Sequence, residues 1–201
     1  MENSPRFSQV LQSLADLDQE KVEFTTVVAA MGTRVHATAL LVLALPETVP
    51  LPLPSASAIP GIPLLLIAGH LALFGENSGL PQRIRNLAIP TRIFQLLLRY
   101  LGPALRVLER VSRPRWPAVA ERERVFGVVC AFLAIILLLP LPLVNAAPAG
   151  LLSVIAWGMI QKDGFVIAIG VIGSALLTAF LLGMVAWFSE RGLASLLEML
   201  A

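Results

Sequence analysis

Two apolar segments, each interrupted by prolines, constrain this chain more than any other feature. The first covers residues 35–75 and is broken after Leu45; the second covers residues 125–161 and is broken after Leu139. Proline lacks the backbone N–H and clashes with the preceding helical turn, so a regular helix should not continue through either centre. We therefore predict two helical hairpins that form an internal repeat. The predicted helix-breaking residues are Pro46, Pro50, Pro52, Pro140, Pro142 and Pro148.

The chain holds more apolar sequence than a water-soluble particle of its size can bury. Of its 201 residues, 57% are hydrophobic and 14% are charged, whereas soluble domains carry about 25% charged residues. The sequence therefore predicts an all-α polytopic membrane protein in which residues 1–201 form a single membrane domain.

The apolar runs beside each break are short for a membrane crossing. The longest, Val125 to Leu139, has 15 residues, or about 22 Å of helix, while the hydrocarbon core of a bilayer is about 30 Å thick. Irregular backbone at membrane depth survives only where protein or water satisfies its carbonyls. Two geometries stay open: each hairpin is re-entrant, or it crosses fully with a proline-rich periplasmic turn.

Residues 164–188 are predicted to form one long transmembrane helix near the C-terminus. The stretch from Phe165 to Phe188 has 24 residues without a charge, and about 20 apolar residues suffice to cross a bilayer. Before it, Lys162, Asp163 and Gly164 predict a tight turn in which Gly164 adopts a positive φ.

Residues 76–124, which join the two hairpins, are rich in arginine. The part from 83 to 124 holds ten arginines and three glutamates, a net charge of +7. Between residues 89 and 111, arginines alternate with apolar residues, which is typical of helices lying in the headgroup plane; a kink is expected at Gly102-Pro103. Since positive charge favours the cytoplasmic side, we expect an interfacial linker that contacts anionic lipid and not nucleic acid.

The same argument orients the rest of the chain. Residues 1–34 are expected to form short cytoplasmic helices, because they precede the first hairpin and each hairpin returns to the face on which it starts. The helix over residues 164–188 then crosses once more. The N-terminus is therefore expected in the cytoplasm and the C-terminus in the periplasm.

Few ionisable or polar groups lie in the hairpins, and they are the candidates for an ion or substrate path. Glu47 is the only acid within the hairpin cores, and an ionisable residue at membrane depth is a functional candidate. Its alternatives are a solvated turn or an ion pair with Arg34. Asn145 is its counterpart in the second hairpin and either satisfies free carbonyls or contacts substrate. His36 and His70 are either packing residues or ligands.

No pattern in the sequence indicates catalysis. It has no phosphate-binding loop, no nucleophile elbow and no His-Glu metal motif, which are the signatures of common enzyme sites. The single cysteine, Cys130, lies in an apolar run and is expected to be a small buried residue. We expect neither an enzyme, nor a cofactor, nor a bound metal.

Four motifs occur in a characteristic order: Leu45-Pro-Glu-Thr-Val-Pro-Leu-Pro-Leu-Pro54, Pro60-Gly-Ile-Pro63, Pro140-Leu-Pro-Leu-Val-Asn-Ala-Ala-Pro148 and Lys162-Asp-Gly164. In these motifs the chain resembles the ExoD family of bacterial membrane proteins, which is associated with exopolysaccharide synthesis. The resemblance implies a bacterial inner-membrane location. It also implies exopolysaccharide machinery as a partner, and a second copy of the chain is a further candidate partner.

Two functions stay open from the sequence. The first is a transporter-like or channel-like protein for a small ion or solute, with its path where the two hairpins meet. The second is a non-catalytic scaffold or accessory subunit of exopolysaccharide assembly or export. The paired breaks favour the first function, and the scarcity of charge within the apolar segments favours the second.

Overall fold

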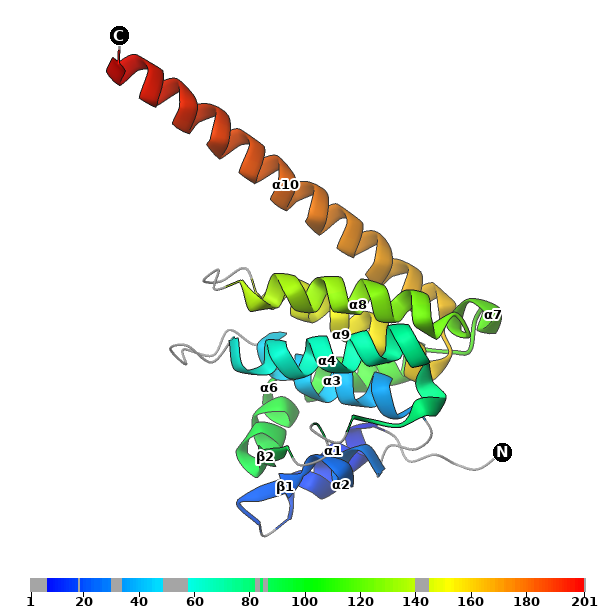
Figure 1. The fold of residues 1–201 in the computed structure, drawn as a ribbon. Helices are drawn as coiled ribbons and strands as arrows, with labels where there is room; N and C mark the ends of the chain where they lie inside the picture. The colour runs from blue at the N-terminus through cyan, green and yellow to red at the C-terminus, as the bar shows by residue number, and fades with distance from the viewer. Residues whose placement is uncertain are drawn as a thin grey trace.

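The structure, a computed structural model, describes residues 7–17, 19–29, 34–48, 58–81, 84, 87–139 and 145–200. The described elements are α1 (Phe7–Ala15), β1 (Lys21–Glu23), α2 (Phe24–Ala29), α3 (Val35–Thr48), α4 (Ala58–Phe74), the 3-10 helix η1 (Glu76–Ser78), β2 (Ala88–Pro90), α6 (Thr91–Val111), α7 (Pro117–Ala120), α8 (Glu123–Leu138), α9 (Ala146–Gln161) and α10 (Gly164–Leu200). The prediction of a mostly helical protein is confirmed (Figure 1).

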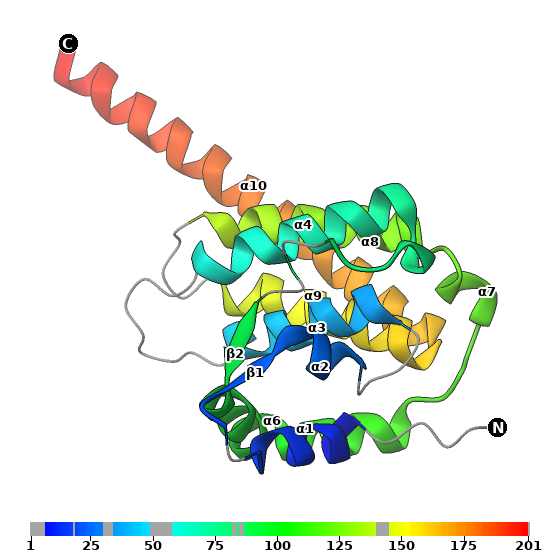
Figure 2. The same cartoon turned by 60° about the horizontal axis from the view of Figure 1, so that its bottom comes forward.

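Four apolar helices lie side by side and form the core (Figure 2). We call α3 with α4 the first helix pair and α8 with α9 the second. The most extensive packing runs between the pairs, because α4 packs along α8 and α3 packs along α9. The packing of α3 on α4, and of α8 on α9, is less extensive. The two pairs therefore interlock and form one packed unit.

The helices of this core run in alternating directions. At one end, Gly61 near the start of α4 approaches Leu138 at the end of α8. At the other end, Gly127 near the start of α8 approaches Ala72 near the end of α4. Contacts of His36 with Glu76 and of Arg34 with Met159 place the start of α3 beside the ends of α4 and α9. The starts of α3 and α8 thus lie with the ends of α4 and α9, and we call this the polar end of the core. We call the opposite end, where the predicted breaks lie, the proline end.

Pro46 and Pro148 do not break helices, which corrects the sequence prediction. Pro46 lies inside α3, which continues to Thr48, and the hydroxyl of Thr48 donates a hydrogen bond to the carbonyl of Leu45. Pro148 lies in the first turn of α9, where a backbone N–H has no intrahelical partner in any case. The other predicted breaks, Pro50, Pro52, Pro140 and Pro142, lie outside the described residues.

The predicted N-terminal segment and arginine-rich linker pack together as a layer against the core. Helix α1 lies along α6, and Ser8 donates hydrogen bonds of 2.8 Å from its N and Oγ to the carboxylate of Glu109. Strands β1 and β2 pair antiparallel with Val22 opposite Ile89, so the all-α prediction misses a small sheet. The predicted kink at Gly102-Pro103 does not divide α6, which is assigned as one helix.

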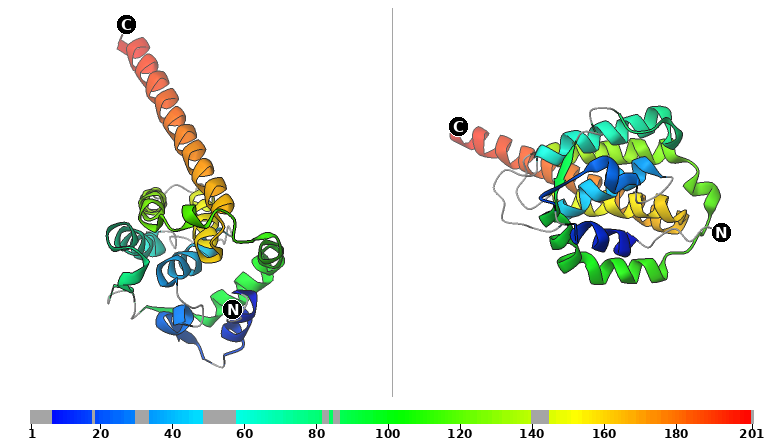
Figure 3. Two further views of the ribbon diagram at one scale, coloured as in Figure 1. Left: turned by 90° about the vertical axis from the view of Figure 1, so that its right-hand side faces the viewer. Right: turned by 90° about the horizontal axis from the view of Figure 1, so that it is seen from below.

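Helix α10 packs its first turns on α9 and then leaves the core, on the side opposite α1 and α2 (Figures 1 and 3). The predicted helix over residues 164–188 is confirmed as a helix, and residues 189–200 continue it. Residues 164–191 are long and apolar enough to cross a membrane, and among the described residues this is the one helix that meets both criteria. The side chains beyond the core are exposed, as at Phe180 and Val185.

The turn between α9 and α10 differs in one respect from the prediction. Lys162, and not Gly164, adopts the left-handed conformation, with φ of 54°. Gly164 begins α10, where a Cβ atom would lie 2.8 Å from the carbonyl oxygen of Trp116. The buried carboxylate of Asp163 accepts hydrogen bonds from the backbone N–H of Arg113 and of Phe165. The turn therefore anchors α10 to the connector before α7.

Candidate functional site

Charged and polar side chains from four elements converge at the polar end of an otherwise apolar core. We call them the polar cluster, and they are Arg34, His36, His70, Glu76 and Glu123. Arg34 precedes α3, His36 lies in its first turn, His70 lies in α4, Glu76 begins η1 and Glu123 begins α8. The cluster therefore touches both helix pairs.

The carboxylate of Glu76 caps the N-terminus of α3. Its Oε1 atom accepts hydrogen bonds from the backbone N–H of His36 at 2.6 Å and of Ala37 at 3.3 Å. The first N–H groups of a helix have no partner within the helix, and negative charge is favourable there. Glu76 therefore does for α3 what a capping residue does elsewhere, although it lies about forty positions along the chain.

Arg34 and Glu123 connect this cap to the second helix pair. Arg34 Nη1 donates to the carbonyl of Met159 in the last turn of α9 at 2.6 Å, and Nη2 lies 3.6 Å from Glu123 Oε1. The backbone N–H of Glu76 donates to Glu123 Oε2 at 3.3 Å. Arg34 is thus paired with Glu123 and not with Glu47, which corrects the ion-pair alternative for Glu47.

The two histidines of the chain lie next to one another. His36 Nε2 and His70 Nδ1 are 2.9 Å apart, at hydrogen-bonding distance, and the rings are stacked with an interplanar angle of 11°. His36 is fully buried, whereas His70 is half-buried and also lies 3.3 Å from the hydroxyl of exposed Ser78. The pair therefore connects the buried Glu76 with the molecular surface.

Burial raises the pKa of Glu76 to about 7, and the nearby Glu123 carboxylate acts in the same direction. The backbone N–H groups of Ala37 and His36, and the charge of Arg34, oppose this rise. Burial prevails because water can no longer solvate the carboxylate. Glu76 can therefore exchange a proton near neutral pH.

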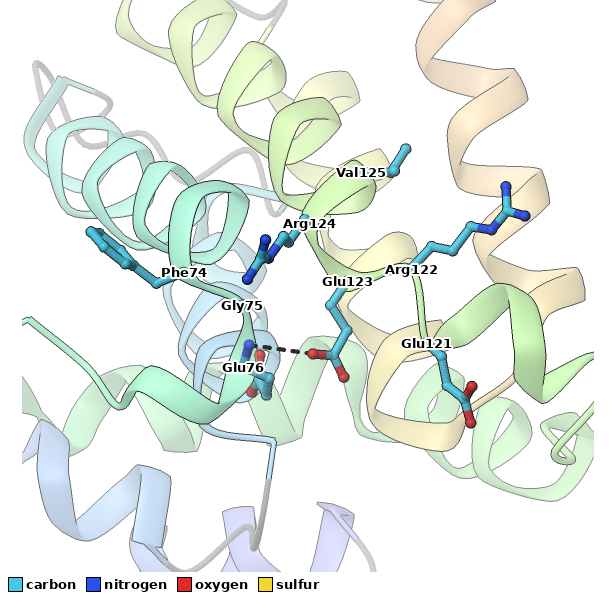
Figure 4. Close-up of a pocket in the computed structure, with 8 residues that line it drawn as sticks. All are labelled: Phe74, Gly75, Glu76, Glu121, Arg122, Glu123, Arg124 and Val125. Atoms are coloured by element: carbon cyan, nitrogen blue, oxygen red, sulfur yellow. Dashed lines mark hydrogen bonds between the residues drawn. The ribbon is translucent and has the colours of Figure 1, made fainter.

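A cavity of about 310 Å³ opens beside the polar cluster, between the end of α4 and the start of α8 (Figure 4). Its lining residues are Phe74, Gly75, Glu76, Glu121, Arg122, Glu123, Arg124 and Val125. Figure 4 shows the side chain of Glu123 extending toward Glu76, while Glu121 and Arg122 lie farther from Glu76. Within the described part of the chain, no group of three His, Cys, Asp or Glu side chains is arranged to hold a metal ion.

The remaining sequence candidates lie at the proline end. Glu47 is half-buried in the last turn of α3. Asn145 is buried directly before α9, and its Oδ1 atom has no hydrogen-bond partner among the described residues. The structure thus brings Arg34, His36 and His70 together, and it places Glu47 and Asn145 at the other end of the core.

Sequence reasoning missed the two acids that organise the polar cluster. Glu76 and Glu123 both fall at the edges of the predicted linker, where charged residues are expected to face solvent. One signal could have identified them: each lies directly beside the polar end of an apolar run, Glu76 after α4 and Glu123 at the start of α8.

We predict that the stability of the protein depends on pH through Glu76. Because the pKa of this carboxyl is about 7 in the folded chain, against an ordinary value of 4.5, the folded chain keeps a proton between these values that the unfolded chain has released. The free energy of unfolding should therefore fall as pH rises through this window, by about 3 kcal/mol in total. Thermal melts of the detergent-solubilised protein at a series of pH values measure the slope.

Glu76→Gln should flatten this slope, because glutamine keeps the hydrogen-bonding shape and cannot ionise. The matched control is Glu109→Gln, which neutralises a carboxylate bound by Ser8 in the α1–α6 contact, outside the cluster. It should retain the slope of the unmodified chain. Equal slopes in Glu76→Gln and in the unmodified protein would contradict the prediction.

Comparison with known proteins gives one family. A profile described as "Exopolysaccharide synthesis, ExoD" matches residues 7–183. A Synechocystis protein, "Uncharacterized protein slr1875", is 26% identical over 193 residues, which cover 94% of this chain and 91% of that protein. "Protein ExoD" of Rhizobium meliloti is 29% identical over 160 residues, which cover 76% of this chain and 66% of that protein. No solved structure matches the chain significantly.

Proposed function

Because this chain belongs to the ExoD family of exopolysaccharide synthesis proteins, we propose that it passes a small ion or solute across the bacterial inner membrane. In this proposal the two helix pairs are the two hairpins of an internal repeat, embedded in the bilayer as a multi-pass unit. Helix α10 adds one crossing. The N-terminus is cytoplasmic and the C-terminus is periplasmic.

The observation that carries the proposal is the chain of ionisable groups, buried or half-buried, where the two helix pairs meet. His70, His36 and Glu76 follow one another at contact distances, and Glu123 continues the series into α8. Ionisable groups are costly inside an apolar bundle, and in membrane proteins they mark ion and proton paths.

The proline end supplies the second part of the proposed path. Glu47 lies there in α3, and Asn145 lies directly before α9, which packs along α3; the amide oxygen of Asn145 has no hydrogen-bond partner among the described residues. A polar atom without a partner in a buried position carries a desolvation cost that a ligand would remove. In this proposal the ion passes between the polar end and the proline end of the core.

Two further features of the proposal concern partners. Arg92, Arg99, Arg106 and Arg110 lie exposed on α6, and the acid of this helix, Glu109, is bound by Ser8. This excess of positive charge suits anionic lipid headgroups. A second copy of the chain and the exopolysaccharide machinery remain the proposed protein partners.

One observation favours a second function, that of an accessory subunit without transport activity. The core is densely filled: Gly127 of α8 lies so close to α4 that no side chain fits between them. Beyond the core, α10 exposes large apolar side chains such as Leu176 and Phe180. These features suit a membrane-anchored protein that binds a partner through α10.

We expect flux of a small ion in proteoliposomes that contain the purified protein, measured with interior dyes for H⁺, K⁺ and Cl⁻. Glu47→Gln and Glu76→Gln should each reduce this flux at least about tenfold, because each removes an ionisable group from the proposed path. Glu109→Gln is the matched control and should conduct like the unmodified chain. Folded protein that supports no flux of any probe would overturn the proposal in favour of the accessory role.

A further inference from the structure

One nitrogen of the polar cluster is buried and has no hydrogen-bond partner among the residues that the structure describes. His36 has no exposed surface, and its Nδ1 atom makes no hydrogen bond within the described part of the chain. This nitrogen faces Glu76 Oε2 at 3.6 Å. On the other side of the ring, Nε2 contacts His70 Nδ1 at 2.9 Å. The imidazole thus bridges a histidine and a carboxylate.

Leaving such an atom unpaired costs free energy that a hydrogen bond to Glu76 would recover. A buried polar atom without a partner costs about 1–3 kcal/mol. A proton on His36 Nδ1 or on Glu76 Oε2 gives this pair a donor and an acceptor, and a small approach of the two side chains makes the hydrogen bond. The position between His36 Nδ1 and Glu76 Oε2 can therefore hold one proton.

We propose that His36 and Glu76 together bind one exchangeable proton, and that His70 and Ser78 connect this site to the surface. The inference rests on the proposed function only in naming the proton as the transported or coupling ion. The proton-binding site itself stands on the geometry of the two histidines and the carboxylate.

The proposed proton transfer from solvent to Glu76 conserves protons and charge at each step. Half-buried His70 takes up a proton from solvent and passes its Nδ1 proton to His36 Nε2. His36 then releases its own Nδ1 proton to Glu76 Oε2 and is left as the other neutral tautomer. One positive charge has entered, and Glu76 has become neutral. Glu76 lines the cavity at the polar end, so the proton can leave there into water.

Charged and polar groups from several elements surround the site. Arg34 pairs with Glu123 at 3.6 Å, so its charge is shared between Glu123 and Glu76. Arg124 lies near Gly75, and Glu121 and Arg122 line the outer part of the cavity. The backbone of Gly79 also faces the His36 ring. Helix α9 contributes the carbonyl of Met159, which accepts a hydrogen bond from Arg34.

The chain has two histidines in total, so ¹⁵N-histidine NMR of untagged protein in nanodiscs reports on both rings without overlap. We expect the two rings to titrate as a coupled pair, with transitions that a single-site curve does not fit. Glu76→Gln should remove from the histidine curves the transition near pH 7 that they share with Glu76, because glutamine cannot ionise. Glu109→Gln should leave them unchanged.

Two independent single-site titrations, unaffected by Glu76→Gln, would overturn the inference. If Glu76→Gln does not fold, His70→Gln serves instead: the remaining His36 signal should lose its coupled transition, and a His36 curve equal to that of the unmodified chain would also overturn it. Coupled titration without flux in proteoliposomes refutes transport and leaves the proton site. Flux with uncoupled histidines refutes the proton site and leaves transport.

Discussion

Replacing Gly127 with leucine should lower the free energy of unfolding by about 3 kcal/mol or more. At this position α8 touches the backbone of α4: a Cβ atom would lie 2.6 Å from Ala72 N and 2.8 Å from Ala72 Cα. Backbone atoms inside a helix cannot rotate away as a side chain can. The added side chain must therefore separate the two helices along their length, and the melting temperature in detergent should fall accordingly.

Gly69→Leu is the matched control for this prediction. Gly69 lies in α4 itself, and a Cβ atom there meets nothing within 4 Å. Since leucine is a better helix former than glycine by roughly 1 kcal/mol or less, stability should stay the same or rise slightly. A Gly127→Leu protein that melts like Gly69→Leu would show that α4 and α8 are not in contact.

The second large effect is expected for Arg34→Met. Methionine fills a similar volume, but it leaves the Met159 carbonyl without its donor and Glu123 without its cation. Breaking a fully buried ion pair costs about 3–5 kcal/mol. The side chains of Arg34 and Glu123 keep 13% and 24% of their exposure, so solvent screens the pair and we expect a loss of about 2–3 kcal/mol.

A double-mutant cycle tests whether this loss comes from the pair. Glu123→Gln alone should also destabilise, and the combination with Arg34→Met should cost less than the sum of the two by about 1 kcal/mol. Arg106→Met, at an exposed position of α6, controls for loss of charge alone and should be close to neutral. Strictly additive effects of Arg34→Met and Glu123→Gln would mean that the two side chains do not interact.

The helices of the core were predictable, because long apolar runs and absent charges fix where a helix can lie. The charge-free stretch after Gly164 predicted α10, and the apolar runs around residues 40, 68, 132 and 155 predicted α3, α4, α8 and α9. Helix ends were less predictable. Pro46 lies in the last turn of α3, so the hydrogen bond that it removes and the clash of its ring affect the end of the helix and not its middle.

The partners of these helices were not predictable from the sequence. Each core helix is apolar on nearly all sides, so no stripe of residues indicates which neighbour it will meet. The pairing of β1 with β2 is equally hidden, because Val22 and Ile89 lie far apart along the chain and each strand has three residues. The role of Glu76 as a cap for α3 depends on this tertiary arrangement and has no local signal.

The central claim is that the two helix pairs interlock as one unit, with α4 lying antiparallel along α8. Disulfide formation tests it most directly, in a Cys130→Ala background that removes the native cysteine. An added Cβ atom at Gly61 would lie 3.2 Å from Leu138 Cγ, which is within reach of a disulfide. Gly61→Cys with Leu138→Cys should therefore cross-link rapidly in membranes under mild oxidation, as measured by mass spectrometry of the linked peptides. Gly61→Cys with Val125→Cys, at the opposite end of α8, should not; no link in the first pair, or equal links in both, would contradict the account.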